Sequence, residues 1–310
     1  MEQKSESLRE AFGKELEELG SQMSDLVVVG ADTTESIKSG LFGDKFPERF
    51  FNVGIAEQNM VGVSSGLALY GKTVVCGTYM VFLERAIDQI RNTIAYCNLD
   101  VKIIGAHTGI SVGPDGGSHQ DIEDIAIMRA LPNMKVVAPA DAYSTKALVK
   151  EAVTTKGPFY IRLIRPNSMS VYSNEEIKVG KANVLRDGKD ISIIACGIMV
   201  PEALKAAERL QTVGISASVI DCHTIKPIDE STIIKAANNT GRIITAEDHN
   251  IMGGLGSAVA EVLSRRRPTL IGMIGVHDVF GESGQDAELM VKYGISEQSI
   301  FEKAKGMVKP

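Results

Sequence analysis

The sequence lacks several features that would place it in a specialised class. Its 310 residues include no tryptophan and only 5% aromatic residues. No run approaches the roughly 18 consecutive apolar residues that a membrane-spanning helix requires. Residues 1–20 follow a charged amphipathic pattern rather than a basic stub and an apolar secretion segment. These absences argue against a membrane protein and predict a cytoplasmic one.

Positive charge and paired cysteines are also scarce. Lysine and arginine total 33 against 39 acidic residues, a net charge of −6, and they form no long cluster that would attract nucleic acid. The four cysteines lie far apart, without a C-x-x-C pair or a ligand-like histidine spacing; they are Cys76, Cys97, Cys196 and Cys222. We therefore expect no nucleic-acid partner, and we expect reduced, structural thiols.

Short runs rich in valine and isoleucine alternate with longer segments of helical period. This alternation is typical of parallel sheets with crossover helices. Strands are expected at 26–30, 73–76, 101–105, 135–138, 160–163, 192–195, 217–221, 242–245 and 270–274. Helices are expected at 34–40, 54–70, 82–96, 121–130, 142–154, 201–211, 229–238, 254–264, 285–292 and 296–306. Because the strand candidates are continuously apolar, helices should cover both faces of each sheet.

The polar stretch 167–190 interrupts this alternation and shows no clear period until Ile191. We therefore predict an α/β protein of two doubly wound domains, each with a mainly parallel sheet. The first domain should span 1–172 and the smaller second domain 191–310, with a linker over 173–190.

One motif points to the wrong chemistry. Gly66-Leu-Ala-Leu-Tyr-Gly71-Lys72-Thr73 fits the phosphate-loop pattern G-x-x-x-x-G-K-[ST]. A phosphate loop follows a strand and opens a helix, whereas this segment follows a helical pattern and precedes a strand. Gly71 is better interpreted as a helix terminator. Gly253-Gly254-Leu-Gly256 lacks dinucleotide-binding spacing and predicts a tight turn into a helix.

In open parallel sheets, ligands bind beyond the carboxyl ends of the strands. The segments at these ends include 32–36, 78–82 and the unusual loop Gly105–His119, which holds five glycines, two histidines and an aspartate. Loops of this length are often functional, because a rigid scaffold can aim their polar groups at a ligand. The alternative is a glycine-rich surface loop with solvated histidines.

Glu57 follows an apolar entry into a predicted helix, in Gly54-Ile55-Ala56-Glu57-Gln58. From spacing alone, a glutamate that merely favours the helix dipole explains it. A carboxylate in an apolar setting could instead exchange protons near neutral pH. Both interpretations remain open at this point.

Several ordered motifs together resemble the C-terminal half of transketolase over nearly the whole chain. They are Val53-Gly-Ile-Ala-Glu57-Gln58, Gly77-Thr-Tyr79-Met-Val-Phe82, His107-x(7)-Asp115-x(3)-His119-Gln120 and Glu247-Asp248-His249 with Gly253-Gly254-Leu-Gly-Ser-Ala. The resemblance implies a pyrimidine-binding domain up to about residue 170, followed by the family's C-terminal domain. It implies the cofactor thiamine diphosphate, and a pentose phosphate pathway activity that moves a two-carbon ketol unit from ketose to aldose phosphates.

The resemblance also assigns roles on the cofactor side. Glu57 matches the glutamate that hydrogen-bonds the pyrimidine ring and promotes the imino tautomer, which accepts the thiazolium proton. Tyr79 and Phe82 match aromatic residues that stack on the pyrimidine, and core packing is their alternative role. Asp32 matches an aspartate after the first strand. Arg85 departs from the third aromatic of transketolases and resembles the arginine of deoxyxylulose-phosphate synthases, where its guanidinium plane could still stack.

On the substrate side, His107 and Asp115 match residues that hydrogen-bond sugar hydroxyls, and His119 matches one that assists proton transfer near the reacting carbon. A bidentate arginine suits a phosphate group. Arg165 matches the transketolase position and is the preferred candidate, while Arg162 has its analogue in the synthases. Ser36 matches a serine that contacts phosphate.

The G-D-G motif, with which transketolases hold diphosphate and Mg²⁺, is absent from this sequence. The resemblance therefore implies one subunit of a split enzyme, whose partner carries G-D-G and the Mg²⁺ ligands. Self-association of this chain would give a heterotetramer of two plus two. Three alternatives remain: the β chain of a 2-oxoacid dehydrogenase decarboxylase component, a deoxyxylulose-phosphate-synthase-like half, and a non-catalytic regulatory half. The histidine–aspartate–histidine loop argues against the β chain.

Overall fold

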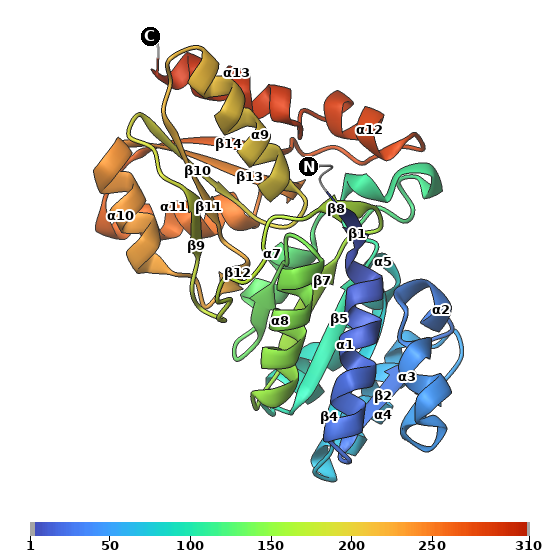
Figure 1. The fold of residues 1–310 in the computed structure, drawn as a ribbon. Coiled ribbons are helices and arrows are strands. Elements are labelled where there is room, and N and C mark those ends of the chain that lie inside the picture. The colour runs from blue at the N-terminus through green and yellow to red at the C-terminus, as the bar shows by residue number, and fades with distance from the viewer. Residues whose placement is uncertain (1–3, 309–310) are drawn as a thin grey trace.

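The computed structural model describes residues 4–308, which fold into two α/β units (Figure 1). The first unit is built on a seven-stranded sheet of order β12-β6-β7-β5-β4-β2-β3. Its strands are β2 (Leu26–Gly30), β3 (Phe50–Asn52), β4 (Thr73–Tyr79), β5 (Val101–Ala106), β6 (Lys135–Val137), β7 (Phe159–Leu163) and β12 (Thr224–Lys226). All neighbours pair in parallel except β12, which joins the β6 edge antiparallel and comes from the second half of the chain.

Helices pack around this sheet, and side-chain caps begin two of them. Ser7 caps α1 by accepting a hydrogen bond from the Glu10 N–H, and Asp141 and Ser144 form a capping box at α8. The helices of this unit are α1 (Leu8–Gln22), α2 (Thr34–Ile37), α3 (Gly40–Lys45), α4 (Glu57–Leu69), α5 (Met80–Leu83), α6 (Ile87–Gln89), α7 (Asp124–Ala130) and α8 (Ala142–Thr154). A single helix over 82–96 is predicted, but this region divides into α5, a 3₁₀ turn, α6 and a π-helical stretch over Ile90–Ala95.

The second unit has a five-stranded sheet of order β14-β13-β10-β11-β9. Its strands are β9 (Asn183–Arg186), β10 (Ile191–Ala195), β11 (Ala217–Asp221), β13 (Arg242–Asn250) and β14 (Leu270–Val276). Its helices are α9 (Met199–Thr212), α10 (Glu230–Thr240), α11 (Leu255–Arg266), α12 (Asp286–Lys292) and α13 (Glu297–Val308). The sheet is parallel except for β9, which pairs antiparallel with β11.

The segment predicted as a linker is more ordered than expected. Strand β9 lies within 173–190 and pairs with β11, so this part of the segment belongs to the second sheet. Upstream of it, β8 (Asn167–Met169) pairs antiparallel with β1 (Ser5–Ser7). These short strands escape detection because their pairing partners are distant in sequence and their own pattern is mostly polar.

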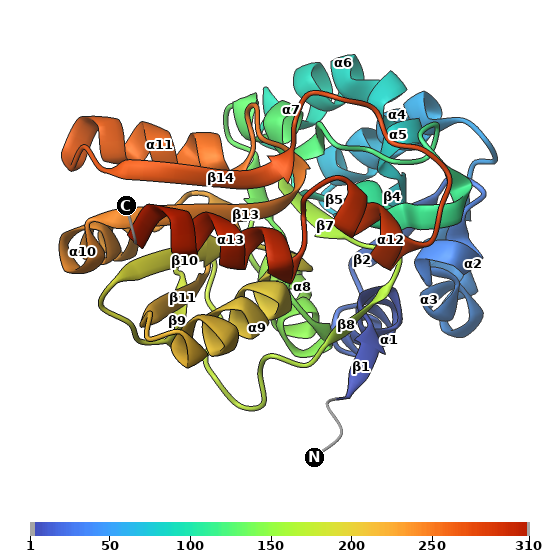
Figure 2. The same cartoon turned by 90° about the horizontal axis from the view of Figure 1, so that it is seen from above.

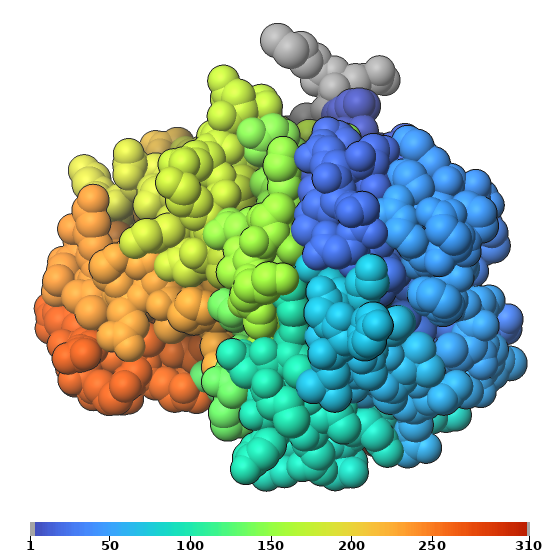
Figure 3. Space-filling view, turned by 90° about the horizontal axis from the view of Figure 1, so that it is seen from below, coloured from blue at the N-terminus to red at the C-terminus, as the bar shows by residue number. Residues whose placement is uncertain are grey.

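The two units share a continuous core. One cluster of buried apolar side chains runs from Leu8 in the first unit to Ala304 in the second. Figure 3 shows the two units side by side, with green and yellow parts of the chain between them, and Figure 2 shows the segment between β14 and α12 crossing over the first unit. Strands β2, β5, β7, β10 and β11 are buried along their whole length, as their continuous apolar pattern predicts.

The local structure bears on three points raised by the sequence. Gly71 follows α4 at φ +88° and precedes β4, so Gly66–Thr73 runs from helix to strand and is not a phosphate loop. All four cysteines are free, and three are buried. Within residues 4–308, the helices are too short or too polar to cross a membrane.

Candidate functional site

The strand order brings the predicted site residues to one edge of the first sheet. Strands β7, β5, β4 and β2 are consecutive neighbours and parallel, so their carboxyl ends lie side by side. Arg165, His107, Tyr79 and Asp32 lie at or just beyond these four ends. The topology thus gathers polar groups from segments up to 133 residues apart at a single edge.

Four rings form a compact group at this edge. The ring centroids of Tyr79 and His107 are 3.7 Å apart with planes inclined by 16°, and those of Tyr79 and Phe82 are 5.4 Å apart and nearly parallel. His119 meets Phe82 edge-on at 5.3 Å. Tyr79, Phe82 and His119 keep partial exposure, so these rings present a surface on which a planar ligand could pack.

His107 is the buried member of this group. It is 2% exposed, its backbone has φ +55°, and its Nδ1 takes part in no hydrogen bond. Burial, with the positive charges of Arg9 and Arg165 and the nearby His119, lowers the pKa of His107 to about 3. The imidazole is therefore neutral at physiological pH, and its uncharged ring can serve a hydroxyl-bearing ligand.

Arg165 and Asp115 approach each other beside the rings. Arg165 Nη1 donates to the carbonyl of Val112 (2.9 Å), and its Nη2 lies 3.7 Å from Asp115 Oδ1. The Val112 bond anchors the guanidinium to the glycine-rich loop. Both side chains keep exposed polar atoms that could meet a substrate.

Arg9, which the sequence prediction missed, joins this group from α1. Its guanidinium donates to the carbonyls of Ser36 (2.8 Å) and Arg165 (2.9 Å), and its Nε has no partner. Burial lowers the pKa of Arg9 despite the nearby Tyr79 and Glu10. A cation in the first turn of a helix opposes the helix dipole, and that local conflict is the signal that could have identified it.

Arg162, near the end of β7, is buried and already paired, which does not suit the expected phosphate contact. It is 3% exposed; its Nε donates to Asp124 Oδ2 (2.8 Å) and its Nη2 to the carbonyl of Asp248 (2.7 Å). The same Asp124 oxygen accepts from the Tyr160 hydroxyl. A guanidinium that is already paired and excluded from solvent does not fit a phosphate site, so Arg165 is the better placed of the two arginines.

Glu57 begins α4 as a buried carboxylate with spare hydrogen-bonding capacity. It is 3% exposed, and its Oε2 accepts no hydrogen bond. The same oxygen lies 3.6 Å from Arg85 Nη1, whose side chain is 60% exposed. Gln58 donates to the Arg85 carbonyl, which ties the two segments together. A buried carboxylate oxygen without a donor is unusual and can receive one from a ligand.

Asp32 is exposed beyond the end of β2. Its backbone has φ +66°, and its N–H donates to Asn52 Oδ1, which also accepts from the Gly54 N–H. Asn52 therefore fixes the turn that carries Asp32 and the approach to Glu57. Nearby, the Thr33 hydroxyl donates to Thr78 at the end of β4.

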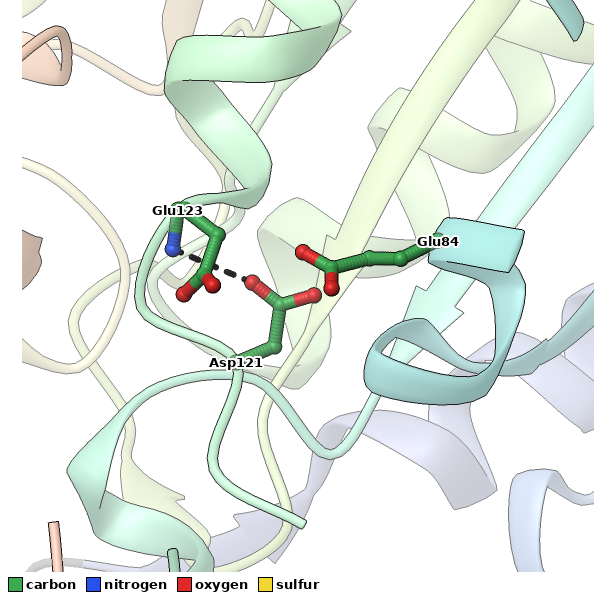
Figure 4. A group of neighbouring side chains, drawn as sticks. All are labelled: Glu84, Asp121 and Glu123. Carbon is green, nitrogen blue, oxygen red and sulfur yellow. Dashed lines mark hydrogen bonds between the residues drawn. The ribbon is translucent and has the colours of Figure 1, made fainter. Parts of the chain in front are cut away.

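A group of carboxylates could hold a metal ion near this region. One oxygen from each of Glu84, Asp121 and Glu123 lies within 4.8 Å of the others, and no other such group is found within residues 4–308 (Figure 4). Asp121 Oδ1 accepts from the backbone N–H of Glu123 and Asp124. Burial, with the charges of Glu123 and Asp124, raises the pKa of Glu84 to about 7. Protons can therefore relieve the repulsion within this group without a cation.

The equivalent edge of the second sheet is closed by its own side chains. Glu247 in β13 is fully buried and accepts from the N–H groups of Leu255 (2.6 Å) and Gly256 (2.7 Å) at the start of α11. A Cβ on Gly254 would lie 2.0 Å from Glu247 Oε2, so only a glycine at this turn admits the carboxylate. The backbone N–H groups at the start of α11 are therefore occupied by a side chain of this protein rather than left for a ligand.

Comparisons with known proteins agree with this arrangement. The family models of the transketolase pyrimidine-binding domain and the transketolase C-terminal domain match residues 4–170 and 180–300. The chain belongs to the transketolase family. It is 48% identical over 96% of its length to the "Putative transketolase C-terminal section" of Methanocaldococcus jannaschii, of which it covers 94%.

Two further relatives of this transketolase-family chain bear on its organisation. A solved structure described as "Split gene transketolase, inactive beta4 tetramer" superposes with a TM-score of 0.91 at 46% identity, covering 98% of this chain and 99% of that one. The 1-deoxy-D-xylulose-5-phosphate synthase of Desulforudis audaxviator is 39% identical over 96% of this chain, which covers 48% of the synthase. The predicted family and fold are thus confirmed.

Proposed function

We propose that this chain is the C-terminal subunit of a split, thiamine-diphosphate-dependent transketolase that moves a two-carbon ketol unit between ketose and aldose phosphates in the cytoplasm, in pentose phosphate metabolism. The observation that carries the proposal is the Oε2 of buried Glu57, which accepts no hydrogen bond and has only the exposed Arg85 guanidinium near it, together with the group of four rings. The relatives described above support the same class of reaction.

The residues present fit thiamine diphosphate. An aminopyrimidine needs a carboxylate that can receive a donor and an aromatic surface on which to stack, and Glu57 with Tyr79 and Phe82 supplies both. Arg85 and Asp32 would add further contacts to the cofactor. When bound, the cofactor supplies the nucleophilic carbon and the electron sink that allow cleavage of a carbon–carbon bond next to a carbonyl group.

The chain's own residues then orient the cofactor, hold protons and bind substrate. Glu57 would share a proton with the pyrimidine ring, in a setting shielded from water. His119, partly exposed at the edge, would assist proton transfer near the reacting carbon, while neutral His107 and exposed Asp115 would hydrogen-bond sugar hydroxyls.

The phosphate end of a substrate would meet Arg165, whose guanidinium is partly exposed. Arg9 donates to the backbone carbonyls of Ser36 and Arg165, so it ties together the two segments that bear the predicted phosphate contacts. We therefore assign Arg9 a positioning role beside the phosphate-binding residues. Arg162 is removed from that set, because its guanidinium is buried and paired.

The partner would supply what this sequence lacks. A G-D-G-bearing chain would provide the diphosphate and Mg²⁺ contacts, leaving the cofactor between the two subunits. Near the start of α4, Ile55 is 77% exposed, and at the other end of this helix Leu69 is 73% and Tyr70 86% exposed; apolar exposure of this extent fits a surface that another chain covers. Pairing of two such chains with two partners would give the heterotetramer.

The deciding experiment is a ketol-transfer assay with xylulose phosphate, ribose phosphate, thiamine diphosphate and Mg²⁺. It is run on this chain alone, on a candidate G-D-G-bearing partner alone, and on the mixture. Activity only in the mixture is the expected result. If the mixture binds cofactor but transfers no ketol unit, the assignment of these substrates is wrong.

A second reaction is favoured by one residue, Arg85, which resembles the synthase arginine and lies against Glu57. The alternative is condensation of a 2-oxoacid with glyceraldehyde phosphate, as deoxyxylulose-phosphate synthases perform. Replacing the ketose donor by pyruvate in the same mixture separates the two. Carbon dioxide release that depends on glyceraldehyde phosphate would favour the synthase reaction.

A further inference from the structure

A carboxylate of the second unit holds the glycine-rich loop of the first. Asp248 lies in β13 and is 1% exposed. Its Oδ1 accepts from the Ile110 N–H (2.8 Å) and its Oδ2 from the Ser111 N–H (3.3 Å). These two donors begin the segment Ile110–Asp115, two short 3₁₀ turns separated by a kink at Gly113, which ends at the aspartate expected to bind substrate.

The absence of a side chain at Gly109 makes room for this carboxylate. Its φ is +82°, and an added Cβ would lie 2.1 Å from Asp248 Oδ2. A side chain at this position would therefore expel the carboxylate, and the backbone conformation itself disfavours any other residue. The glycine and the aspartate, 139 residues apart, depend on each other.

The far end of the loop is covered by the same unit. A Cβ on Gly117 would lie 2.7 Å from the Gly281 carbonyl, and one on Gly116 would lie 2.4 Å from Ser283 Oγ. Gln120 Nε2 donates to the carbonyls of Ile110 and Gly113 within the loop and of Glu282 in the second unit. Figure 2 shows this part of the second unit, between β14 and α12, reaching over the first.

Asp248 is itself held in place. Arg162 Nη2 donates to its backbone carbonyl (2.7 Å), and the positive guanidinium offsets the buried negative charge. Arg165, on the same segment, donates to the Val112 carbonyl inside the loop. The loop is thus fixed from the second unit at its start and from the strand end at its middle.

We propose that Asp248 is a positioning residue, which orders the loop Gly109–Gly117 so that Asp115 faces the ring group and Arg165. The second unit would then contribute to the site indirectly, by fixing a loop of the first. The substrate-binding consequence rests on the proposed function, whereas the ordering of the loop does not.

Hydrogen–deuterium exchange of this chain alone tests the ordering. In Asp248→Ala, peptides covering 108–116 should exchange at least about tenfold faster than in the wild type, because two amides lose a charged acceptor. Asp229→Ala is the matched control. Asp229 caps α10 of the second unit by accepting from the Thr232 N–H, so its loss should speed exchange near 230–233 and leave 108–116 unchanged.

Asp248→Asn guards against failure of the alanine variant to fold, since it keeps the size and one acceptor oxygen. It should speed exchange of 108–116 by less than the alanine variant does. Wild-type exchange of this peptide in a folded variant that lacks the carboxylate would overturn the proposal. Equal acceleration in Asp229→Ala would overturn it too, because the effect would then be global.

The kinetic consequence is measured in the reconstituted mixture. Asp248→Asn should raise the KM for the sugar phosphate about tenfold, with smaller changes in kcat and in thiamine diphosphate affinity. An unchanged KM would refute the positioning role in substrate binding. If the wild-type mixture shows no ketol transfer, the proposed function fails, and the exchange measurement still decides whether Asp248 orders the loop.

Discussion

Two buried glutamates show how differently the two units use the same architecture. Glu57 is the first residue of α4, and Glu247 lies in β13 against the start of α11; both side chains are almost completely buried. Glu247 accepts two backbone hydrogen bonds at the start of α11, whereas Glu57 Oε2 accepts none. At these two helix starts, the first unit keeps a carboxylate oxygen available to a ligand, and the second satisfies its carboxylate internally. Ligand chemistry is therefore expected in the first unit.

Glu57→Gln should have the largest effect on activity. Loss of a carboxylate that holds a proton reduces turnover by about 10²–10⁴-fold in general acid–base catalysis, so ketol transfer should fall at least about 100-fold. The free energy of unfolding should not fall, because the replaced charge has no hydrogen-bond donor at Oε2. Steady-state kinetics and thermal unfolding measure the two effects.

Glu208→Gln, on an exposed position of α9, is the control for this comparison. It should change neither turnover nor the unfolding temperature. Near-wild-type turnover of Glu57→Gln in an assembled complex would contradict the catalytic assignment. Glu57 would then be a helix-start glutamate of the ordinary kind.

Arg162→Ala and Arg165→Ala should separate structure from binding. The first breaks a buried ion pair and leaves Asp124 without its cation, so it should cost about 3–5 kcal/mol of stability. The second should cost less than about 1 kcal/mol, because that guanidinium is partly exposed. Arg165→Ala should raise the KM for the sugar phosphate by about tenfold with little loss of stability, whereas any rise in KM in Arg162→Ala should accompany its loss of stability. Urea unfolding and kinetics on both variants test the contrast, and a reversed pattern would refute it.

Glu247→Gln tests the same comparison in the second unit, where the carboxylate is satisfied by backbone N–H groups. The amide can accept only one of the two backbone hydrogen bonds and presents an N–H₂ group to the other donor, so stability should fall by about 1–3 kcal/mol. Thiamine diphosphate affinity of the reconstituted complex should not change, since this residue serves the second unit alone. A specific loss of cofactor affinity without loss of stability would show that the second edge is also functional.

Glu84→Gln should produce the smallest effect, visible as a change in pH dependence. Burial raises the pKa of Glu84 to about 7, so the native state holds this proton more tightly than the unfolded state does. Its contribution to stability is therefore present below about pH 4.5 and is lost as the pH rises through 7. The variant should be more stable than the wild type above pH 7, on the order of 1 kcal/mol, since residual hydration weakens the full effect.

The measurement is the difference in unfolding free energy between variant and wild type from pH 5 to 8. His107 contributes an opposite pH dependence: because its pKa falls from 6.5 in the unfolded state to about 3 in the native state, stability rises with pH up to about 6.5. This contribution is the same in variant and wild type, so it cancels when their unfolding free energies are subtracted. A flat difference would mean that Glu84 is charged throughout this range. Addition of Mg²⁺ or Ca²⁺ shows whether a cation replaces the proton.

Local sequence pattern predicted the strands and helices that carry the site, because buried parallel strands are continuously apolar and their ends mark the ligand edge. It identified the loop from His107 to His119 by its glycines and histidines. It missed Arg9, since an arginine in an amphipathic helix resembles a surface charge. It also missed the contact between Asp248 and Ile110, because the pairing of distant segments leaves no local signal.

Strands β9 and β12 were missed for the same reason. Each is short, lies at the edge of a sheet and pairs with a strand that its own period does not reveal. The division of the predicted helix at 82–96 had no signal either, because apolar period does not separate α-helical from π-helical turns.

Strand β12 also limits how the chain can be divided. Thr224 and Lys226 pair with β6, and Lys226 Nζ donates to the carbonyls of Arg129 and Leu131. A fragment ending near residue 172 would leave the β6 edge bare and open to pairing with other molecules. The two units therefore form one cooperative block, and truncation between them would yield an aggregating fragment rather than a smaller domain.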